Sequence, residues 1–265
     1  MIKPKKSLGQ NFLIDKNIIN KIISSGKIKK ENVIEIGPGT GNLSKNLINT
    51  DCKSLTLIEK DSHLANEIKK NKIFKKKTNI LIQDILKFDL EKKIKTNSII
   101  FGNLPYNIST KILTNLIKFN VWPPKYKRLV LMFQREVADK IMAKSNTEDY
   151  GRLAVLTHLR LKIVNHFKIS KNCFFPRPKV DSSLLVFEPI LNKKFKIKNI
   201  NNVEYITRIL FSNKRKMINK GFNKLFKNYT SIAKEIKIDL SSRPSQLSFD
   251  EYYKIAESFE KKFFS

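Results

Sequence analysis

A short apolar run that ends in three closely spaced glycines is the feature that most constrains this fold. The segment Val33–Leu43 reads Val-Ile-Glu-Ile-Gly-Pro-Gly-Thr-Gly-Asn-Leu, with glycines at positions 37, 39 and 41. Glycine lets the backbone turn tightly and approach a ligand without a Cβ in the way. The dinucleotide-binding fingerprint would place its third glycine at position 42, where this chain has Asn42. The pattern therefore predicts a strand, a ligand-binding turn and a helix, but not a pyrophosphate cradle.

Three further apolar runs each end in a polar residue. Glu59 follows the run at 54–58, Asp84 follows the run at 79–83, and Asn103 follows the run at 98–101. A carboxylate 18 residues beyond Gly41 can accept both hydrogen bonds of a ribose diol, as in nucleotide-binding βαβ units. A carboxylate at position 84 can accept from an adenine amine. Each acid alone is typical of a helix cap, but four successive strand ends of this kind indicate one ligand site.

The fourth strand end carries the sequence Asn103-Leu104-Pro105-Tyr106. This group suits a flat, exocyclic amine, because the Asn oxygen and a nearby backbone carbonyl can accept two hydrogen bonds from an NH₂ group. The Tyr ring can stack on the attached base. The competing interpretation is a loop in which Asn and Pro only make a turn.

The motifs together resemble a known family. The glycine segment looks like the Glu/Asp-x-Gly-x-Gly-x-Gly loop of S-adenosylmethionine-dependent methyltransferases, and nearly the whole chain resembles the ribosomal RNA adenine N6-dimethyltransferases. Further matching motifs lie at Leu8–Leu13, Gln134–Ala138 and Phe174–Ser182. Two late motifs, Phe211–Lys216 and Arg243–Ser248, are similar to the small-subunit (16S) branch of that family.

The resemblance implies a fold and a division into domains. The fold is an α/β Rossmann-like class I methyltransferase with a seven-stranded, mainly parallel sheet whose last strand is antiparallel. Strands are expected near 32–37, 53–59, 79–84, 97–102, 127–134, 161–168 and 183–188, and the run at 108–117 has helical spacing. Residues 1–190 are expected to form the cofactor-binding domain, beginning with a basic arm over residues 1–10. Residues 191–265 are expected to form a small helical domain that contacts RNA.

The resemblance also implies roles for residues. S-adenosylmethionine is the implied cofactor, and its expected binding residues are Asn11, Leu13, Gly37, Gly39, Gly41, Glu59, Asp84 and Asn103. Asn103 and the Leu104 carbonyl would hold the adenine N6 amine, Pro105 would shape the loop, and Tyr106 and Phe174 would sandwich the base. The expected RNA contacts are Lys179, Lys214, Arg215 and Lys216. The activity implied is dimethylation of adjacent adenosines in a 16S hairpin loop during ribosome biogenesis, without a nucleophilic residue or a metal.

The composition is consistent with a polyanionic partner. The 265 residues include 53 Lys and Arg against 23 Asp and Glu, a formal net charge of +30. Two cysteines and three scattered histidines suggest neither a disulfide framework nor a metal site. No apolar run approaches 18 residues, and the motif that includes Gln10 leaves no room for a cleaved signal. We therefore expect a cytoplasmic monomer that acts on ribosomal RNA within a small ribosomal subunit or its precursor, and not on membranes.

Three alternatives remain open at this point. One is a resistance-type methyltransferase that acts on large-subunit (23S) RNA. Another is a non-enzymatic ribosome assembly factor, which the intact Glu59, Asp84 and Asn103–Tyr106 motifs argue against. The third is a DNA adenine methyltransferase, which would need a target-recognition domain, and the chain offers no long insertion for one.

Overall fold

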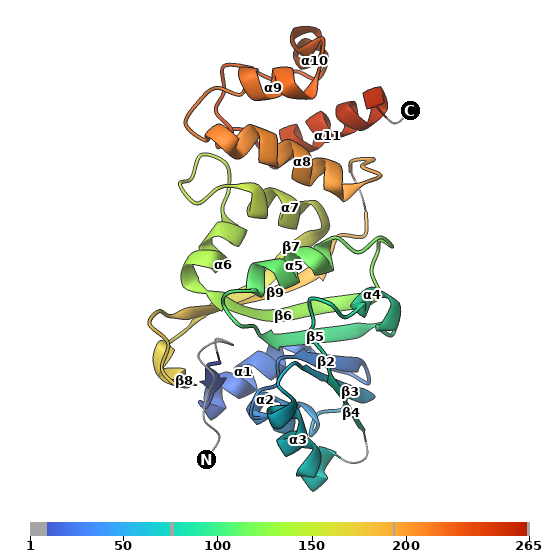
Figure 1. The fold of residues 1–265 in the computed structure, drawn as a ribbon, viewed down its shortest axis with the longest axis vertical. Coiled ribbons are helices and arrows are strands. Elements are labelled where there is room, and N and C mark those ends of the chain that lie inside the picture. The colour runs from blue at the N-terminus through green and yellow to red at the C-terminus, as the bar shows by residue number, and fades with distance from the viewer. Residues whose placement is uncertain (1–9, 75–76, 193, 264–265) are drawn as a thin grey trace. The chain divides into compact units, whose positions relative to one another are not determined.

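The structure is a computed structural model that describes residues 10–74, 77–192 and 194–263 (Figure 1). Most of the expected basic amino-terminal arm, with Lys3, Lys5 and Lys6, lies outside the described residues. The described chain divides into two compact units. The first ends at Ala138 and resumes over Lys162–Pro189, and the second comprises Asp139–Leu161 and Ile190–Phe263.

A seven-stranded sheet forms the centre of the first unit (Figure 1). From one edge to the other its strands are β4 (Thr78–Ile82), β3 (Ser54–Glu59), β2 (Asn32–Ile36), β5 (Ser98–Asn103), β6 (Tyr126–Gln134), β9 (Ser182–Pro189) and β7 (Leu161–Ile169). The first five pair in parallel, and β9 pairs antiparallel with β6. The expected fold class is thus confirmed, including the antiparallel last strand.

Alternation along the strands builds the core. Val33, Leu55 and Leu57, Ile99 and Phe101 point to one face, where they pack with α1 (Lys16–Gly26), α2 (Asn42–Leu47) and α3 (Ser62–Lys70). Side chains at alternate positions of a strand share a face, which explains why the runs are continuously apolar in a sheet covered on both sides. Three more α-helices follow, α4 (Leu90–Lys93), α5 (Ser109–Ile117) and α6 (Arg135–Met142), of which α6 begins in the first unit and ends in the second.

Helix α1 shows how local sequence fixes an element that borders the site. The Asp15 carboxylate accepts from the Ile18 amide at 2.9 Å and so caps the first turn. Ile19 and Ile22 are buried against the sheet. The helix ends at Lys27, whose backbone is left-handed.

A second, two-stranded sheet was not expected from the sequence. Strand β1 (Phe12–Leu13) pairs antiparallel with β8 (Phe174–Phe175), which follows the short 3₁₀ turn η3 (Lys171–Cys173). Phe12 lies opposite Phe175, and Leu13 lies opposite Phe174. This ladder joins the amino-terminal motif to the Phe174–Ser182 motif, which are far apart in the sequence.

The second unit is helical, as expected, but it includes residues that the predicted boundary at 190 left in the first domain. Its helices are α7 (Arg152–Arg160), α8 (Ile200–Leu210), α9 (Asn219–Leu225), α10 (Tyr229–Glu235) and α11 (Phe249–Phe263). The 3₁₀ turn η4 (Phe211–Asn213) follows α8. Another 3₁₀ turn, η2 (Lys72–Phe74), lies in the first unit. Residues 139–161 belong here because the buried Tyr150 ring packs against Phe211, Phe249 and Tyr252, with centroids 5.5–6.5 Å apart.

The late motif Arg243–Ser248 has a structural role in this unit. The Arg243 amide donates to Gln246 Oε1 at 2.6 Å, and the Gln246 amide donates back to the Arg243 carbonyl at 2.9 Å. Ser248 and Glu251 then exchange hydrogen bonds as a capping box that begins α11. The motif therefore closes a turn and starts a helix.

Candidate functional site

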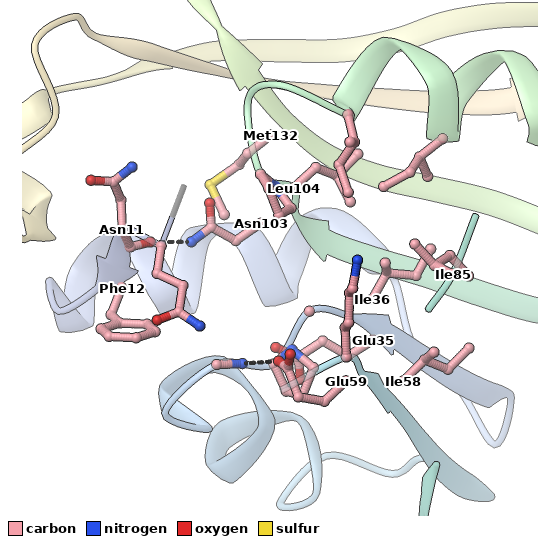
Figure 2. Close-up of a pocket in the computed structure, with 18 of the residues that line it drawn as sticks. Asn11, Phe12, Glu35, Ile36, Ile58, Glu59, Ile85, Asn103, Leu104 and Met132 are labelled. Atoms are coloured by element: carbon pink, nitrogen blue, oxygen red, sulfur yellow. Dashed lines mark hydrogen bonds between the residues drawn. The ribbon is translucent and has the colours of Figure 1, made fainter. Parts of the chain in front are cut away.

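A cavity opens where β2, β3, β4 and β5 end, at the edge of the sheet where ligands bind in open α/β folds (Figure 2). Each of the four strand-end motifs contributes to its lining. The expected site residues that line it are Asn11, Leu13, Gly37, Gly39, Glu59, Asp84, Asn103, Leu104, Pro105 and Tyr106. Two expected site residues, Gly41 and Phe174, are not among its lining residues.

The glycine loop lies between β2 and α2 in a left-handed conformation that glycine adopts most readily. Gly37, Gly39 and Gly41 have φ of 68°, 59° and 79°. A Cβ on Gly39 would lie 2.8 Å from the Phe12 ring, so this residue also allows strand β1 to approach the loop. Gly41 acts instead as the residue that precedes α2. At Gly37 and Gly39 the loop therefore presents backbone to the cavity.

Glu59 places a carboxylate against this loop. Its side chain is largely buried, with 7% exposure, and it accepts from the Gly39 amide at 3.1 Å and the Asp61 amide at 2.9 Å. Burial raises the pKa of Glu59, while these backbone bonds act in the opposite direction. Each carboxylate oxygen has more than one acceptor site, so both can still accept from a ligand diol.

Glu35 is a second buried acid in the lining, and no role was expected for it from the sequence. It lies beside Glu59 in Figure 2, is 1% exposed and accepts from Ser44 Oγ at 2.5 Å. Burial raises the pKa of Glu35 to about 8, with a further contribution from the charge on Glu59. The signal that could have found it is an acid inside a strand whose neighbours are all apolar.

We expect Glu35→Gln to change how stability depends on pH. The native carboxyl keeps its proton up to about pH 8, whereas the unfolded one loses it near its ordinary pKa of 4.5. The wild-type protein therefore loses stability as pH rises through this window. Relative to wild type, the variant should gain on the order of 3 kcal/mol between pH 5 and pH 8. Urea unfolding at both pH values, without cofactor, measures this difference.

Glu67→Gln is the matched control for that experiment. Glu67 lies on the exposed surface of α3, and its pKa is lowered by a hydrogen bond from Lys70, so it does not titrate between pH 5 and pH 8. The same stability difference in both variants would contradict the assignment of the titration to Glu35.

Asp84 differs from these two acids because it is paired and partly open to solvent. Its carboxylate lies 3.0 Å from Lys60 Nζ and accepts from the Leu86 amide at 3.0 Å. The hydrogen bond with Lys60 is the main cause that lowers the pKa of Asp84. Ile58 and Ile85 line the same cavity. The Asp84 carboxylate thus lies in the same cavity as the apolar side chains of Ile58 and Ile85. This combination suits a flat heterocycle that carries a hydrogen-bond donor.

Asn103 is fixed by the amino-terminal motif. Its side-chain nitrogen donates to the Asn11 carbonyl at 2.8 Å, which orients the amide and leaves its Oδ1 to accept from a ligand (Figure 2). The Leu13 carbonyl is held in turn by the Asn42 side chain at 2.8 Å. Asn11 and Leu13 therefore contribute their backbone carbonyls to these two hydrogen bonds. Figure 2 shows Asn103 and Asn11 on one side of the cavity, with Glu35 and Glu59 on the other.

The two expected stacking rings differ in their surroundings. Tyr106 lines the cavity, and its hydroxyl lies 2.9 Å from Ser182 Oγ. Phe174 is 3% exposed and packs into the core cluster, because it pairs with Leu13 in the β1–β8 ladder. Its neighbour Phe175 is 56% exposed. That Phe174 and Tyr106 sandwich the base therefore stays a prediction.

The expected RNA-contacting residues lie on the surface. Lys214, Arg215 and Lys216 are all exposed and follow η4, and the Lys214 ammonium donates to the Glu148 carbonyl. Lys179 is exposed in the loop between β8 and β9.

Within the described residues, no cluster of His, Cys, Asp or Glu could hold a metal ion. None of the described helices combines the length and apolar character that crossing a bilayer requires.

Two relatives of this chain carry the same name. The ribosomal RNA small subunit methyltransferase A of Pelagibacter ubique (strain HTCC1062) is 45% identical over 263 residues, which cover 98% of each chain. The protein of the same name from Wolbachia sp. subsp. Drosophila simulans (strain wRi) is 36% identical over 267 residues, covering 98% of this chain and 95% of its own length.

Solved structures agree on the fold. A dimethyladenosine transferase from Plasmodium falciparum superposes with a TM-score of 0.77 and 27% identity, over 95% of this chain and 98% of its own. The 23S rRNA methyltransferase ErmE superposes with a TM-score of 0.71 over 94% of this chain and 100% of its own. At 20% identity, that second likeness shows the fold alone. The sequence profile of one family, described as ribosomal RNA adenine dimethylase, matches residues 1–261, and the chain belongs to this family.

Proposed function

We propose that this protein uses S-adenosylmethionine to dimethylate the N6 amines of adjacent adenosines in a hairpin loop of 16S ribosomal RNA. The observation that carries the proposal is the Asn103 amide. Its nitrogen is occupied by the Asn11 carbonyl at 2.8 Å, so its oxygen is oriented to accept from an amine at the edge of the cavity. The relatives named small subunit methyltransferase A support the choice of RNA.

The lining of the cavity fits the cofactor. Glu59 offers carboxylate oxygens to a ribose diol, and Asp84 offers an acceptor to an adenine amine beside the apolar Ile58 and Ile85. Gly37 and Gly39 leave room for the rest of the ligand, because both adopt positive φ and carry no Cβ. When bound, the cofactor supplies a methyl group that its sulfonium has already activated, so no nucleophilic side chain is required.

The chain contributes positioning and electrostatics to the reaction. An adenine N6 lone pair is delocalised into the ring and is a poor nucleophile. Hydrogen bonds from the N6–H groups to Asn103 Oδ1 and the Leu104 carbonyl draw this lone pair out of conjugation and stabilise positive charge that develops on nitrogen. The Tyr106 ring holds the base by stacking, a contact worth about 1–3 kcal/mol. The remaining catalytic contribution is the alignment of amine and methyl group.

The target base has to leave its stack to reach Asn103. Enzymes that modify a base act on single strands or extrude the nucleotide, because the target atom is inaccessible within a helix. A hairpin loop supplies such a base at a low free-energy cost of unstacking.

We propose that the protein acts as a monomer in the cytoplasm on the small ribosomal subunit or its precursor. The 23S alternative is less favoured, since the likeness to ErmE is one of fold alone.

The direct test is product analysis on defined RNA. Purified protein and S-adenosylmethionine are incubated with small ribosomal subunits, naked 16S RNA or large subunits, each from cells that lack N6,N6-dimethyladenosine. Digested nucleosides are then analysed by mass spectrometry. We expect dimethyladenosine in 16S RNA, with small subunits the better substrate, and product formation about 10²–10³-fold slower with the Asn103→Ala variant. Product confined to large subunits, or no product on any RNA, would overturn the proposal.

We further propose that Lys179, Lys214, Arg215 and Lys216 contact RNA phosphates, and we expect a salt-dependent signature. Neutralising Lys214, Arg215 and Lys216 together should reduce the log–log slope of RNA affinity against salt by about two to three units, since each phosphate contact contributes about 0.7–0.9. Affinity for S-adenosylmethionine should not change. Fluorescence anisotropy with a labelled 16S hairpin from 50 to 300 mM salt (about the range over which such contacts weaken) measures the slope.

A second triple variant controls for net charge. Lys69, Lys70 and Lys72 are also exposed, and neutralising them removes the same charge from the surface of the first unit. This control should retain the wild-type slope. A wild-type slope in the Lys214/Arg215/Lys216 variant would instead place the phosphate contacts elsewhere, with the amino-terminal lysines at positions 3, 5 and 6 the next residues to test.

A further inference from the structure

Two sequence motifs meet through one hydrogen bond at the edge of the cavity. Tyr106 belongs to the loop after β5, and its hydroxyl lies 2.9 Å from Oγ of Ser182, which begins β9. Tyr106 lines the cavity, whereas Ser182 is not among the lining residues. Ser182 can therefore influence a bound base only through the ring of Tyr106.

Ser182 is a fixed point in the fold. Its side chain is 1% exposed, and its backbone lies opposite Gln134 in the β6–β9 ladder. The preceding residue, Asp181, is also fixed. Its carbonyl accepts from the Arg135 amide at 3.0 Å, and its carboxylate accepts from the Lys171 amide at 3.0 Å. Because the backbone is held on both sides, the serine hydroxyl has a defined position.

The phenol that meets this hydroxyl remains protonated. Burial raises the pKa of the Tyr106 hydroxyl above its ordinary value of 10, and the negative charge of Asp181 raises it further. The phenol therefore serves as a hydrogen-bond partner and not as a base near neutral pH. A hydrogen bond at the hydroxyl restrains rotation of the Tyr106 side chain about its Cα–Cβ bond. Because a phenol hydroxyl donates and accepts best near the ring plane, the direction of this bond also favours one orientation of the ring.

We infer that Ser182 is a positioning residue for methyl transfer, because its hydroxyl restrains the Tyr106 ring in the position from which it stacks on the target adenine. The inference rests on the proposed function, since it needs a base in the cavity mouth. A ring that is already oriented loses less freedom when the base arrives, and this favours capture of the base.

A double-mutant cycle tests the inference. Ser182→Ala should lower kcat/KM for small ribosomal subunits by about 3- to 10-fold, the range expected for one uncharged hydrogen bond. Most of this change should appear in KM for the RNA, with cofactor affinity unchanged. Tyr106→Phe keeps the ring, removes the hydroxyl and should cause a similar loss. The double variant should be no worse than either single variant, because both changes remove the same bond. Ser182→Thr keeps the hydroxyl and should retain most of the activity.

Ser183→Ala is the matched control. Ser183 is also buried, but alternation along β9 turns its side chain to the opposite face of the strand. This variant should keep the wild-type kcat/KM. If the two single effects multiply in the double variant of an active enzyme, only the positioning role of Ser182 is overturned. A wild-type protein that methylates no ribosomal RNA would overturn the proposed function and this inference with it.

Discussion

Replacing Asn103 by Ala is expected to slow methyl transfer by about 10²–10³-fold, the usual cost of losing one preorganised partner of developing charge. The side chain provides the only proposed acceptor for the N6 amine besides the Leu104 carbonyl. Glu59 and Asp84, the proposed partners of the cofactor's adenosine, are untouched, so cofactor affinity should stay within about twofold (~0.4 kcal/mol). Single-turnover kinetics on small ribosomal subunits measures the rate, and calorimetric titration measures the cofactor affinity.

Two checks accompany the Asn103 variant. The change also leaves the Asn11 carbonyl without its 2.8 Å donor, so thermal unfolding should be recorded to separate loss of chemistry from loss of fold. Asn46→Ala is the matched control. Asn46 is exposed on α2, and its side chain donates a hydrogen bond to the Asn42 carbonyl of the same helix. If Asn103→Ala turns over at the wild-type rate, Asn103 does not accept from the amine.

Glu59→Ala is expected to weaken S-adenosylmethionine binding by about 10²–10⁴-fold. The change removes two charge-assisted hydrogen bonds to the ribose, each worth about 1.5–3 kcal/mol, and every 1.4 kcal/mol (roughly) corresponds to a tenfold change in Kd. It also removes the acceptor of the Gly39 amide, which helps to hold the glycine loop. Both effects act in the same direction. Calorimetric titration of the purified variant measures the affinity.

Glu59→Gln separates these two contributions. Glutamine keeps one carbonyl acceptor for the loop but loses the charge and one acceptor for the diol. We therefore expect an affinity between those of wild type and Glu59→Ala. Glu67→Ala removes an exposed carboxylate from α3 and serves as the control. Unchanged affinity in Glu59→Ala would refute the role of Glu59.

The strand-end motifs could be predicted from the sequence because each depends on local information. A glycine with positive φ, an acid after an apolar run and an amide before a proline are all visible without knowledge of distant contacts. The topology of parallel strands then brings them to one edge of the sheet. Glu35 was the exception among the acids, since its place inside an apolar strand indicates a buried acid but not whether that acid faces the core or the ligand.

The pairing of Phe174 with Leu13 could not be predicted, for a physical reason. Phe174 and Phe175 are adjacent, so in an extended strand they face opposite sides, and a shift of one residue in register exchanges them. The register is set by pairing with Phe12 and Leu13, far away in the sequence.

Dependence on distant contacts also explains why the place of residues 139–161 could not be predicted. Their assignment to the second unit depends on contacts between Tyr150 and rings more than 60 residues later.

The place of β9 in the sheet has a consequence for synthesis on the ribosome. β9 lies between β6 and β7 in space, although it follows both in the chain. Until residues 182–189 have emerged, β6 has an unpaired edge of the kind that recruits other chains, and Tyr106 has no Ser182 to meet. Pairings between distant segments also form slowly. A nascent or truncated chain that stops before β9 should therefore be inactive and prone to aggregation, even though every strand that carries a cofactor motif is already complete.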